Sequence, residues 1–316
     1  MSAAVQPAPV PFAPTESQLA VAYSVCRHIT RRAAKNFYYA FLVLPRAKRH
    51  ALSAIYAYMR KCDDIADDAT MPIFERRQKL GSWLDSVHRA LSGQPTDDAI
   101  LLALTDTHHR YNIPVQLLDQ LAYGTEMDVD TEADDLLVCE TPESSTLVRY
   151  RTFEDLQKYC YHVASVVGLV CIRIFGYDDP AAEPLAEKCG LAFQLTNIIR
   201  DVKEDADMGR VYLPEEDLAK FGIAPMELRN APDMVKVRPL LEMEAGRALD
   251  YYKAGDALVD FIEEDSQPAL WVLVNIYRKL LEKIALRNYD VFSGKVSLTV
   301  REKLGVLAKG FLKRLT

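Results

Sequence analysis

The sequence predicts an all-α protein with a single domain and a hydrophobic interior. Apolar residues recur at helical spacing from end to end, and the sequence lacks the series of alternating runs split by Asn-Gly or Asp-Gly turns that marks a β protein. No Gly/Ser-rich linker divides the 316 residues, of which 49% are hydrophobic. A chain of this length and composition can bury a large core. We therefore expect a bundle of helices around that core.

The N-terminal half is predicted to form long helices with clear start signals. Thr15 and Gln18 form a capping box ahead of the apolar run LAVAYSVCRHI. Pro45 fits the first turn of a long helix that runs through residue 68. Further helices are expected over 72–92, 96–110 and 114–130.

The C-terminal half is predicted to continue the helical pattern after one interruption. Helices are expected over 153–175 and 180–206, the second of which follows the helix-starting sequence DDP. The stretch 207–235 reads as mobile, and it is followed by long helices over 236–263 and 267–292. The last helix, 299–315, alternates apolar and basic residues at helical spacing. It is predicted either to pack on the bundle or to lie on an anionic membrane surface.

Charge and cysteine content exclude several classes of protein. The formal net charge is −7 and no basic stripe is present, so we expect no nucleic-acid partner. The six cysteines form no CxxC pair, and residues 1–16, rich in Ala and Pro, read as a disordered tail before a domain over 17–316. The longest apolar run, Val163–Ile172, is too short to span a bilayer. We expect a cytoplasmic protein whose membrane contact, if any, is peripheral to the inner membrane surface.

Two acidic clusters carry the strongest chemical signal. Asp63 and Asp67 are four residues apart, as are Asp201 and Asp205, so each pair occupies one face of a predicted helix. Like charges at that spacing destabilise a helix. A solvated face with ion pairs to nearby Arg and Lys would explain one such pair. Two pairs, each on a helix otherwise built for the interior, favour a shared cation.

The ligand type narrows the choice of cation. Carboxylate oxygens without neighbouring His or Cys favour Mg²⁺ or Mn²⁺ over zinc. Asn197 lies four residues before Asp201 on the same face and can add an amide oxygen. Arg60, Arg200 and Arg210 lie beside the clusters, where guanidinium groups can bind phosphate.

Apolar segments adjoin both acidic clusters. Phe37 and Phe41 share a helical face, and Phe193 lies close to Gln194 and Asn197. These aromatics fit an ordinary core or the wall of an apolar tunnel behind a metal-bearing mouth. The second interpretation suits a substrate with a diphosphate head and a long hydrocarbon tail.

At this point a family resemblance becomes evident. The segments NFYYAFLVLPRAKRHALSAIYAYMRKCDDIADD and LAFQLTNIIRDVKEDADMGRVYLPEEDL resemble the two signature segments of the squalene/phytoene synthase family. The likeness runs from about residue 20 to 295 and includes YCYHVASVVGL and NYDVFSGKV. It implies an all-α isoprenoid-synthase fold with a central active-site cavity. It also implies head-to-head (1'-1) coupling of two prenyl diphosphates through a cyclopropyl intermediate.

The resemblance also implies roles for individual residues. The implied metal ligands are Asp63, Asp67, Asn197, Asp201 and Asp205. Tyr159 and Tyr277 are expected near the reacting carbons, and the substrate contacts are expected from Lys35, Asn36, Phe37, Phe41, Arg60, Val163, Val167, Gly168, Gln194, Arg200 and Arg210. The chain departs from the family at Ala34 and Asn36, where hydroxyl residues are common. The segment DADMGRVYLP is predicted to act as a lid or as a plain loop.

The substrate's tail length is the open question at this stage. Burying five more carbons stabilises a geranylgeranyl tail by up to ~4 kcal/mol over farnesyl, provided that the pocket is deep enough. Small Ser53 hints at a deep pocket, whereas the C-terminal segment resembles bacterial squalene-type members. We expect condensation of two farnesyl diphosphates to presqualene diphosphate or squalene, with phytoene synthesis from geranylgeranyl diphosphate as the alternative.

Three further expectations follow. NADPH is required only if the reaction proceeds to squalene. A class I terpene cyclase, which uses similar aspartates on one substrate, matches the paired segments less well. A non-catalytic helical assembly factor of the same fold is disfavoured because all four aspartates are present.

Overall fold

The computed structural model describes residues 14–34, 37–138, 147–148, 150–230 and 232–315. Its first half forms α1 (Glu16–Ala33), α2 (Phe37–Phe41), α3 (Arg46–Ala66), α4 (Ile73–Leu91), α5 (Ala99–Tyr111) and α6 (Val115–Val138). The second half forms α7 (Phe153–Cys160), a π-helical turn (Tyr161–Ser165), α8 (Val166–Phe175), α9 (Ala182–Asp207), α10 (Glu215–Lys220), α11 (Glu227–Asn230), α12 (Met234–Leu258), the 3₁₀ turn Val259–Phe261, α13 (Gln267–Leu286) and α14 (Val300–Leu315). The all-α fold class is confirmed.

The start signals read from the sequence are present in the structure. Thr15 caps α1 through its side chain and, with Gln18, completes the capping box. Pro45 immediately precedes α3, which ends where Asp67 donates its backbone N–H to the carbonyl of Asp63. The predicted N-terminal tail lies outside the described residues, apart from 14–16.

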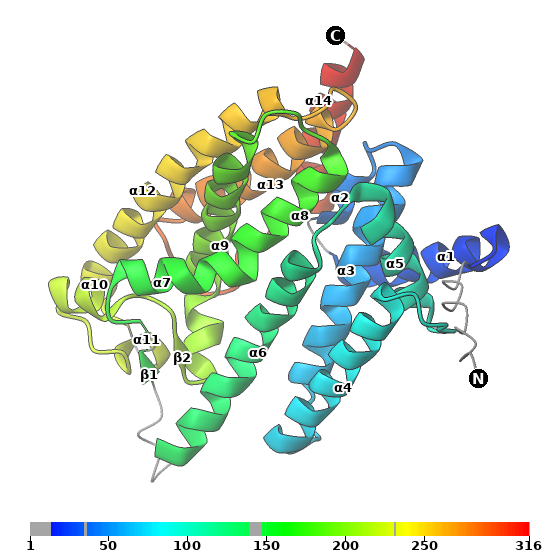
Figure 1. The fold of residues 1–316 in the computed structure, drawn as a ribbon. Helices are drawn as coiled ribbons and strands as arrows, with labels where there is room; N and C mark the ends of the chain where they lie inside the picture. The colour runs from blue at the N-terminus through cyan, green and yellow to red at the C-terminus, as the bar shows by residue number, and fades with distance from the viewer. Residues whose placement is uncertain (1–13, 35–36, 139–146, 149, 231, 316) are drawn as a thin grey trace, which may run out of the picture.

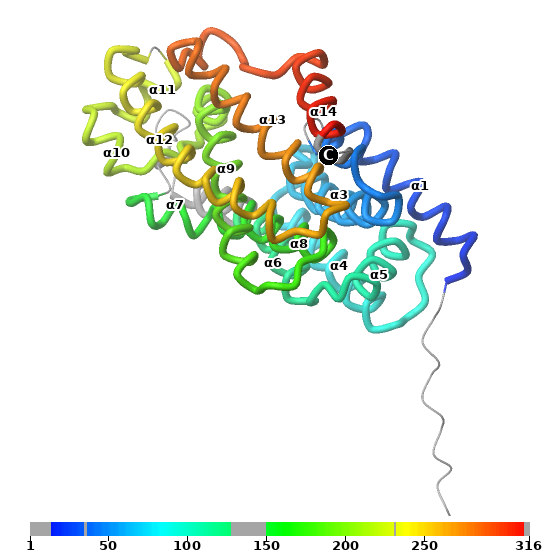
Figure 2. The backbone as a smooth tube through the Cα atoms, turned by 90° about the horizontal axis from the view of Figure 1, so that it is seen from above, coloured from blue at the N-terminus to red at the C-terminus, as the bar shows by residue number. Residues whose placement is uncertain are grey.

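The helices are arranged so that α3, α8 and α9 lie in the interior. Seen from above, α12 and α13 lie on one side of these helices, and α4 and α5 lie on the other (Figure 2). Figure 1 shows α3 and α9 running toward the same end of the molecule, so their acidic C-terminal turns share that end. The interior side chains form one large hydrophobic cluster.

The predicted helix over 153–175 contains an irregularity. The helical path continues from α7 through the π-helical turn Tyr161–Ser165 into α8. A π turn adds one residue to a helical turn and is common at functional sites. The stretch Phe153–Phe175 is long and apolar enough to cross a membrane by composition alone. However, side chains such as Val170 and Ile174 are fully buried in the bundle, as expected for a core helix.

The turn allows two helices to approach closely. Gly190 of α9 faces the backbone of the π-helical turn, and a Cβ there would lie 2.6 Å from the carbonyl oxygen of Ala164. Gly168 of α8 is similarly placed, 2.7 Å from the carbonyl oxygen of Ala186. Because any side chain would clash with backbone, glycine is required at both close approaches.

The structure differs from the expectation of a mobile stretch over 207–235. Strand β2 (Arg210–Val211) pairs in parallel with β1 (Leu147–Val148), in the register Leu147 to Arg210, and α10 and α11 follow it. Val211 and Leu213 are buried. Short elements fixed by buried apolar side chains replace the expected loop, and the DADMGRVYLP segment is therefore anchored at its C-terminal end.

The helix predicted over 267–292 is shorter than expected. It ends at Leu286 because Asn288 and Tyr289 have positive φ angles of 53° and 59°, which a right-handed helix cannot contain. The chain then turns back, and α14 packs against α13.

Candidate active site

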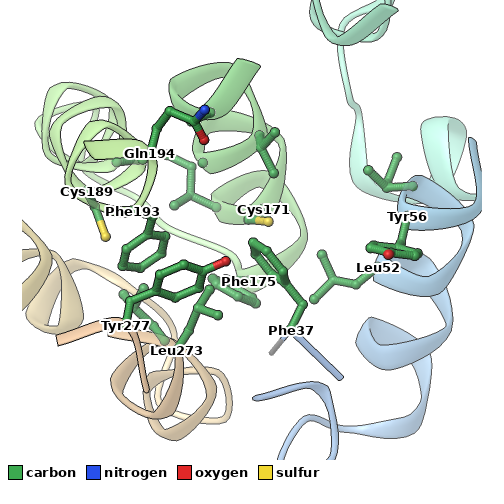
Figure 3. Close-up of a pocket in the computed structure, with 18 of the residues that line it drawn as sticks. Phe37, Leu52, Tyr56, Cys171, Phe175, Cys189, Phe193, Gln194, Leu273 and Tyr277 are labelled. Carbon is green, nitrogen blue, oxygen red and sulfur yellow. The ribbon is translucent and has the colours of Figure 1, made fainter. Parts of the chain in front are cut away.

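An apolar cavity lies between α3, α8, α9 and α13 (Figure 3). Its volume is about 170 Å³. The helices contribute residues from one face each, and in α3 these are Leu52, Ile55, Tyr56 and Met59, spaced as one helical stripe. The predicted tail-binding residues all line this cavity: Phe37, Phe41, Val163, Val167 and Gly168. Gln194, predicted to lie beside the metal ligands, lines it as well.

An aromatic wall closes one side of the cavity. The rings of Phe193 and Tyr277 stack with centroids 4.5 Å apart, and Phe37 meets Tyr277 edge-on at 5.9 Å. Phe37 also contacts Phe41 at 6.4 Å, as the shared helical face predicts. Aromatic faces attract positive charge, so this wall can both exclude water and stabilise a carbocation.

The deep end of the cavity lies where several helices begin or end. Phe175 is the last residue of α8, and Leu258 is the last residue of α12. Lys48 of α3 fastens this end: its Nζ donates to the carbonyl of Phe175 at 2.8 Å, to Asp265 at 2.5 Å and to Ser266 at 3.0 Å. The contacts of Lys48 therefore hold this end of the cavity from outside its apolar lining.

The other end of the cavity opens into a cationic vestibule of about 1080 Å³. Phe37, Tyr56, Asn197 and Tyr277 line both spaces, which makes them a shared boundary. The basic residues that line the vestibule are Arg31, Arg32, Arg60, Arg200, Lys295 and Lys303. Such a set of cations suits an anionic head group, while the adjoining cavity suits an apolar tail.

The first acidic pair lies one turn beyond the vestibule on α3. Asp63 is partly buried and accepts a hydrogen bond from Thr125 of α6 at 3.3 Å, whereas Asp67 is exposed. Burial, with the neighbouring Asp67 charge, raises the pKa of Asp63 to about 6. Arg60 pairs with Asp64 at 2.5 Å, which places its guanidinium between the acidic turn and the vestibule.

The second acidic pair lies on the facing helix, α9. Asp201 binds Arg200 and also pairs with Lys295 at 3.3 Å. Burial and the Asp201 charge raise the pKa of Asp205 to about 7. Arg210 lies beside Asp205 and opposes this rise. Arg60 and Arg200, each next to its acidic pair, both line the vestibule, whereas none of the four aspartates is among the described residues that line it.

The residues present fit a hard divalent cation. The side-chain oxygen of Asn197 is buried without a hydrogen-bond partner, although it lies at the boundary of the vestibule. Burial, together with the neighbouring Asp67 and Asp201 charges, raises the pKa values of Asp63 and Asp205, and a bound cation would favour their charged forms. Among the described residues, no three His, Cys, Asp or Glu side chains form a ready-made metal cluster. Magnesium needs only one or two protein carboxylates when phosphate oxygens supply the rest.

Some predicted residues lie elsewhere. The Tyr159 ring stacks on Tyr212 and lies tilted against Tyr150, with ring centroids 5.3 Å apart in each pair. Tyr159 is not among the described residues lining either space, so its role near the reacting carbons stays a prediction. Ser53 was expected to face the cavity, but it is not among the described residues that line it, and its hydroxyl donates to the carbonyl of Arg49 within α3, so this placement was wrong. Lys35 and Asn36 lie outside the described residues.

Sequence reasoning missed several vestibule residues. Arg31, Arg32, Lys295 and Lys303 come from α1, α14 and the segment before α14, far in sequence from the acidic clusters. Thr125 was missed in the same way. The segment NYDVFSGKV contains Lys295, so the family resemblance was the available signal for that residue.

Comparisons with known proteins agree with this geometry. A profile described as squalene/phytoene synthase matches residues 30–302. The chain belongs to the squalene/phytoene synthase family. It is 34% identical to a protein named 15-cis-phytoene synthase from Synechococcus elongatus, over 96% of this chain and 97% of that protein. It is 33% identical to a phytoene synthase from Mycobacterium tuberculosis, over 95% and 94% of the two chains.

Solved structures show the same fold. A crystal structure of a dehydrosqualene synthase in complex with ligand superposes with a TM-score of 0.81 at 28% identity, covering 94% of this chain and 98% of that one. Squalene synthase HpnC from Alicyclobacillus acidocaldarius gives 0.73 at 27% identity, over 87% and 97%. This member of the family is a prenyltransferase of isoprenoid biosynthesis, as the sequence predicted.

Proposed function

We propose that the protein couples two geranylgeranyl diphosphates head-to-head to phytoene, with magnesium bound between the two aspartate pairs. One observation carries the reaction type: an apolar cavity opens into a cationic vestibule that both acidic helices flank. The names of the two relatives reported above support the tail length, because both are phytoene synthases. Phytoene synthesis was the alternative in the sequence analysis. The reaction preferred there, the condensation of two farnesyl diphosphates, is now the second candidate.

Each part of the chain has a task in this reaction. Arg60, Arg200 and Lys295 hold the diphosphate heads in the vestibule. When bound, magnesium neutralises the departing pyrophosphate as a Lewis acid. Phe193 and Tyr277 shield the allylic cation from water and stabilise its charge. The apolar cavity binds the tails.

Incubation of the purified protein with each prenyl diphosphate tests the proposal. With magnesium and geranylgeranyl diphosphate, mass analysis of extracted lipids is expected to show a C40 hydrocarbon without added NADPH. Chelation of the metal is expected to abolish it. A C30 product from farnesyl diphosphate alone would refute the tail length, and no condensed product from either substrate would refute the reaction.

The farnesyl reaction remains the second candidate because two structural neighbours are named dehydrosqualene and squalene synthases. In that case the product would be presqualene diphosphate, or squalene if NADPH is supplied. The same incubation separates the two candidates by product mass.

A further inference from the structure

Helix α14 exposes several large apolar side chains on its outward face. Val300, Leu304 and Phe311 are 60%, 47% and 41% exposed, and Leu312 is 63% exposed. At 100° per residue these side chains, with Gly305 and Ala308, span about 140° of the helix surface, and the exposed side chain of Arg301 lies inside this arc. A helix on the surface of a soluble bundle normally turns charged and polar residues outward. An outward arc with four exposed large apolar side chains and a single cation therefore indicates a partner.

The opposite face of α14 fixes the helix in this orientation. Val306 and Leu307 are buried against the bundle. Gly310 fits tightly against Val272 of α13, since a Cβ there would lie 2.3 Å from that side chain. Lys283 of α13 also binds Glu302 at 2.9 Å. These contacts dock the helix from Glu302 to Gly310, so the outward arc is held away from the bundle.

The charge around the arc is strongly positive. The α14 sequence VREKLGVLAKGFLKRL carries five basic residues and one acidic residue, a net of +4 on a chain of net −7. The acidic one, Glu302, is the partner of Lys283. Lys309 borders the arc on one side, where it lines a groove of about 320 Å³ with Lys279. Lys303, on the other side, lines the vestibule.

We propose that α14 docks the protein on an anionic lipid bilayer, with the apolar side chains of the outward arc among the acyl chains and with Arg301 and the flanking lysines at the lipid phosphates. Apolar insertion combined with basic flanks is the signature of an interfacial helix. Charge argues against a second copy of the chain as the occupant. In a two-fold contact each +4 helix would face another +4 helix, and like charges oppose that pairing.

Docking by α14 orients the active site. Residues 295–298, just before α14, and Lys303 in its first turn line the vestibule. The entrance to the vestibule therefore lies beside the lipid surface when the arc is inserted. An amphiphile with a phosphate head can therefore move laterally from the bilayer into the vestibule, with its head group in contact with the basic residues that line the vestibule.

Co-sedimentation of the full chain with vesicles tests the docking and needs no catalytic activity. One set of vesicles is phosphatidylcholine, and the other is equal parts phosphatidylcholine and phosphatidylglycerol. The variants are the pair Leu304→Ser with Phe311→Ser, and Lys309→Gln. The matched control is Phe74→Ser, because Phe74 of α4 is 67% exposed.

The unaltered protein is expected to sediment with the anionic vesicles, and this binding is expected to weaken as the salt concentration rises. With the neutral vesicles the protein is expected to remain in the supernatant. The double serine variant is expected to lower the partition coefficient about tenfold, and Lys309→Gln about fivefold, while Phe74→Ser has no effect. Equal binding to both vesicles, no binding, or an equal loss in the control overturns the proposal. So does a dimer, seen by sedimentation equilibrium, that Phe311→Ser dissociates.

Discussion

Replacing Gly190 by Ala tests the close approach between α9 and the π-helical turn. The new methyl would lie 2.6 Å from the carbonyl oxygen of Ala164, where ordinary contact begins at 3.4 Å. The two backbones must therefore separate by about 0.8 Å. A gap of that size loses about a quarter to a half of the dispersion attraction across the contact. Overpacking of this kind costs about 1–3 kcal/mol.

The expected change is measurable by thermal unfolding. With an unfolding entropy of about 2.1 cal/mol/K per residue, 1 kcal/mol corresponds to about 1.5 °C for a chain of this length. Gly190→Ala is therefore expected to lower Tm by about 2–5 °C. It also narrows the cavity, which Gly190 lines, so kcat/KM for the prenyl diphosphate falls.

A matched variant isolates the clash. Gly246 lies exposed within α12, and a methyl group added there would have no atom within 4 Å. Gly246→Ala is expected to stabilise the helix by about 0.5–1 kcal/mol, which raises Tm by about 1 °C. Far-UV circular dichroism of both variants gives the comparison. A Tm for Gly190→Ala equal to or above that for Gly246→Ala would show that the approach is not tight.

The other predictions concern the acids, the floor of the cavity and pH. Asp63→Asn with Asp205→Asn is expected to lower turnover at least about a hundredfold with the fold retained, because several kcal/mol of charge stabilisation are lost; unchanged product formation would show the acids to be non-catalytic. Lys48→Met loosens the Phe175 end of the cavity and is expected to change the ratio of the kcat/KM values for C15 and C20 substrates. The control Lys283→Met breaks an ion pair away from the cavity and is expected to leave this ratio unchanged. Equal effects of the two substitutions would refute a positioning role for Lys48. The backbone N–H of Thr299 and the Lys283 ammonium lower the pKa of Glu302 from 4.5 to about 2. Its stabilising contribution is therefore complete above about pH 4.5 and lost toward pH 2, so hydrogen exchange in α14 is expected to rise over that range, and a Glu302→Gln variant that shows the same pH dependence contradicts this.

The acidic clusters were predictable because their signal is local. The four-residue spacing fixes Asp63 and Asp67 on one face of any α-helix, and the same holds for Asp201 and Asp205. The tail-binding face of α3 was only partly predictable. Ser53 was assigned to the cavity, but Leu52 and Tyr56 define the lining stripe, about 100° away. The spacing of residues shows which side chains share one face of a helix. Which face lines the cavity depends on the neighbouring helices that pack against it.

Long-range features were beyond sequence reasoning. Lys295 reaches Asp201 across 94 residues of chain, and no local pattern announces such a pairing. Strand β2 and helices α10 and α11 are too short to show a hydrophobic period, so 207–235 read as a mobile stretch. Its order depends on burial of side chains such as Leu213, which only the tertiary fold provides.

The π-helical turn Tyr161–Ser165 gives the cavity a simple means of adjustment. One residue of an ideal α-helix corresponds to 100° of rotation. Deleting a single residue from this turn would convert it to regular α-helix. The side chains of α8 would then be rotated about the helix axis relative to those of α7. Either the Tyr159 stack or the Val167 wall would then point the wrong way. Chains of this design can therefore vary the shape of their interior by gaining or losing one amino acid at a single place, with no change in composition elsewhere.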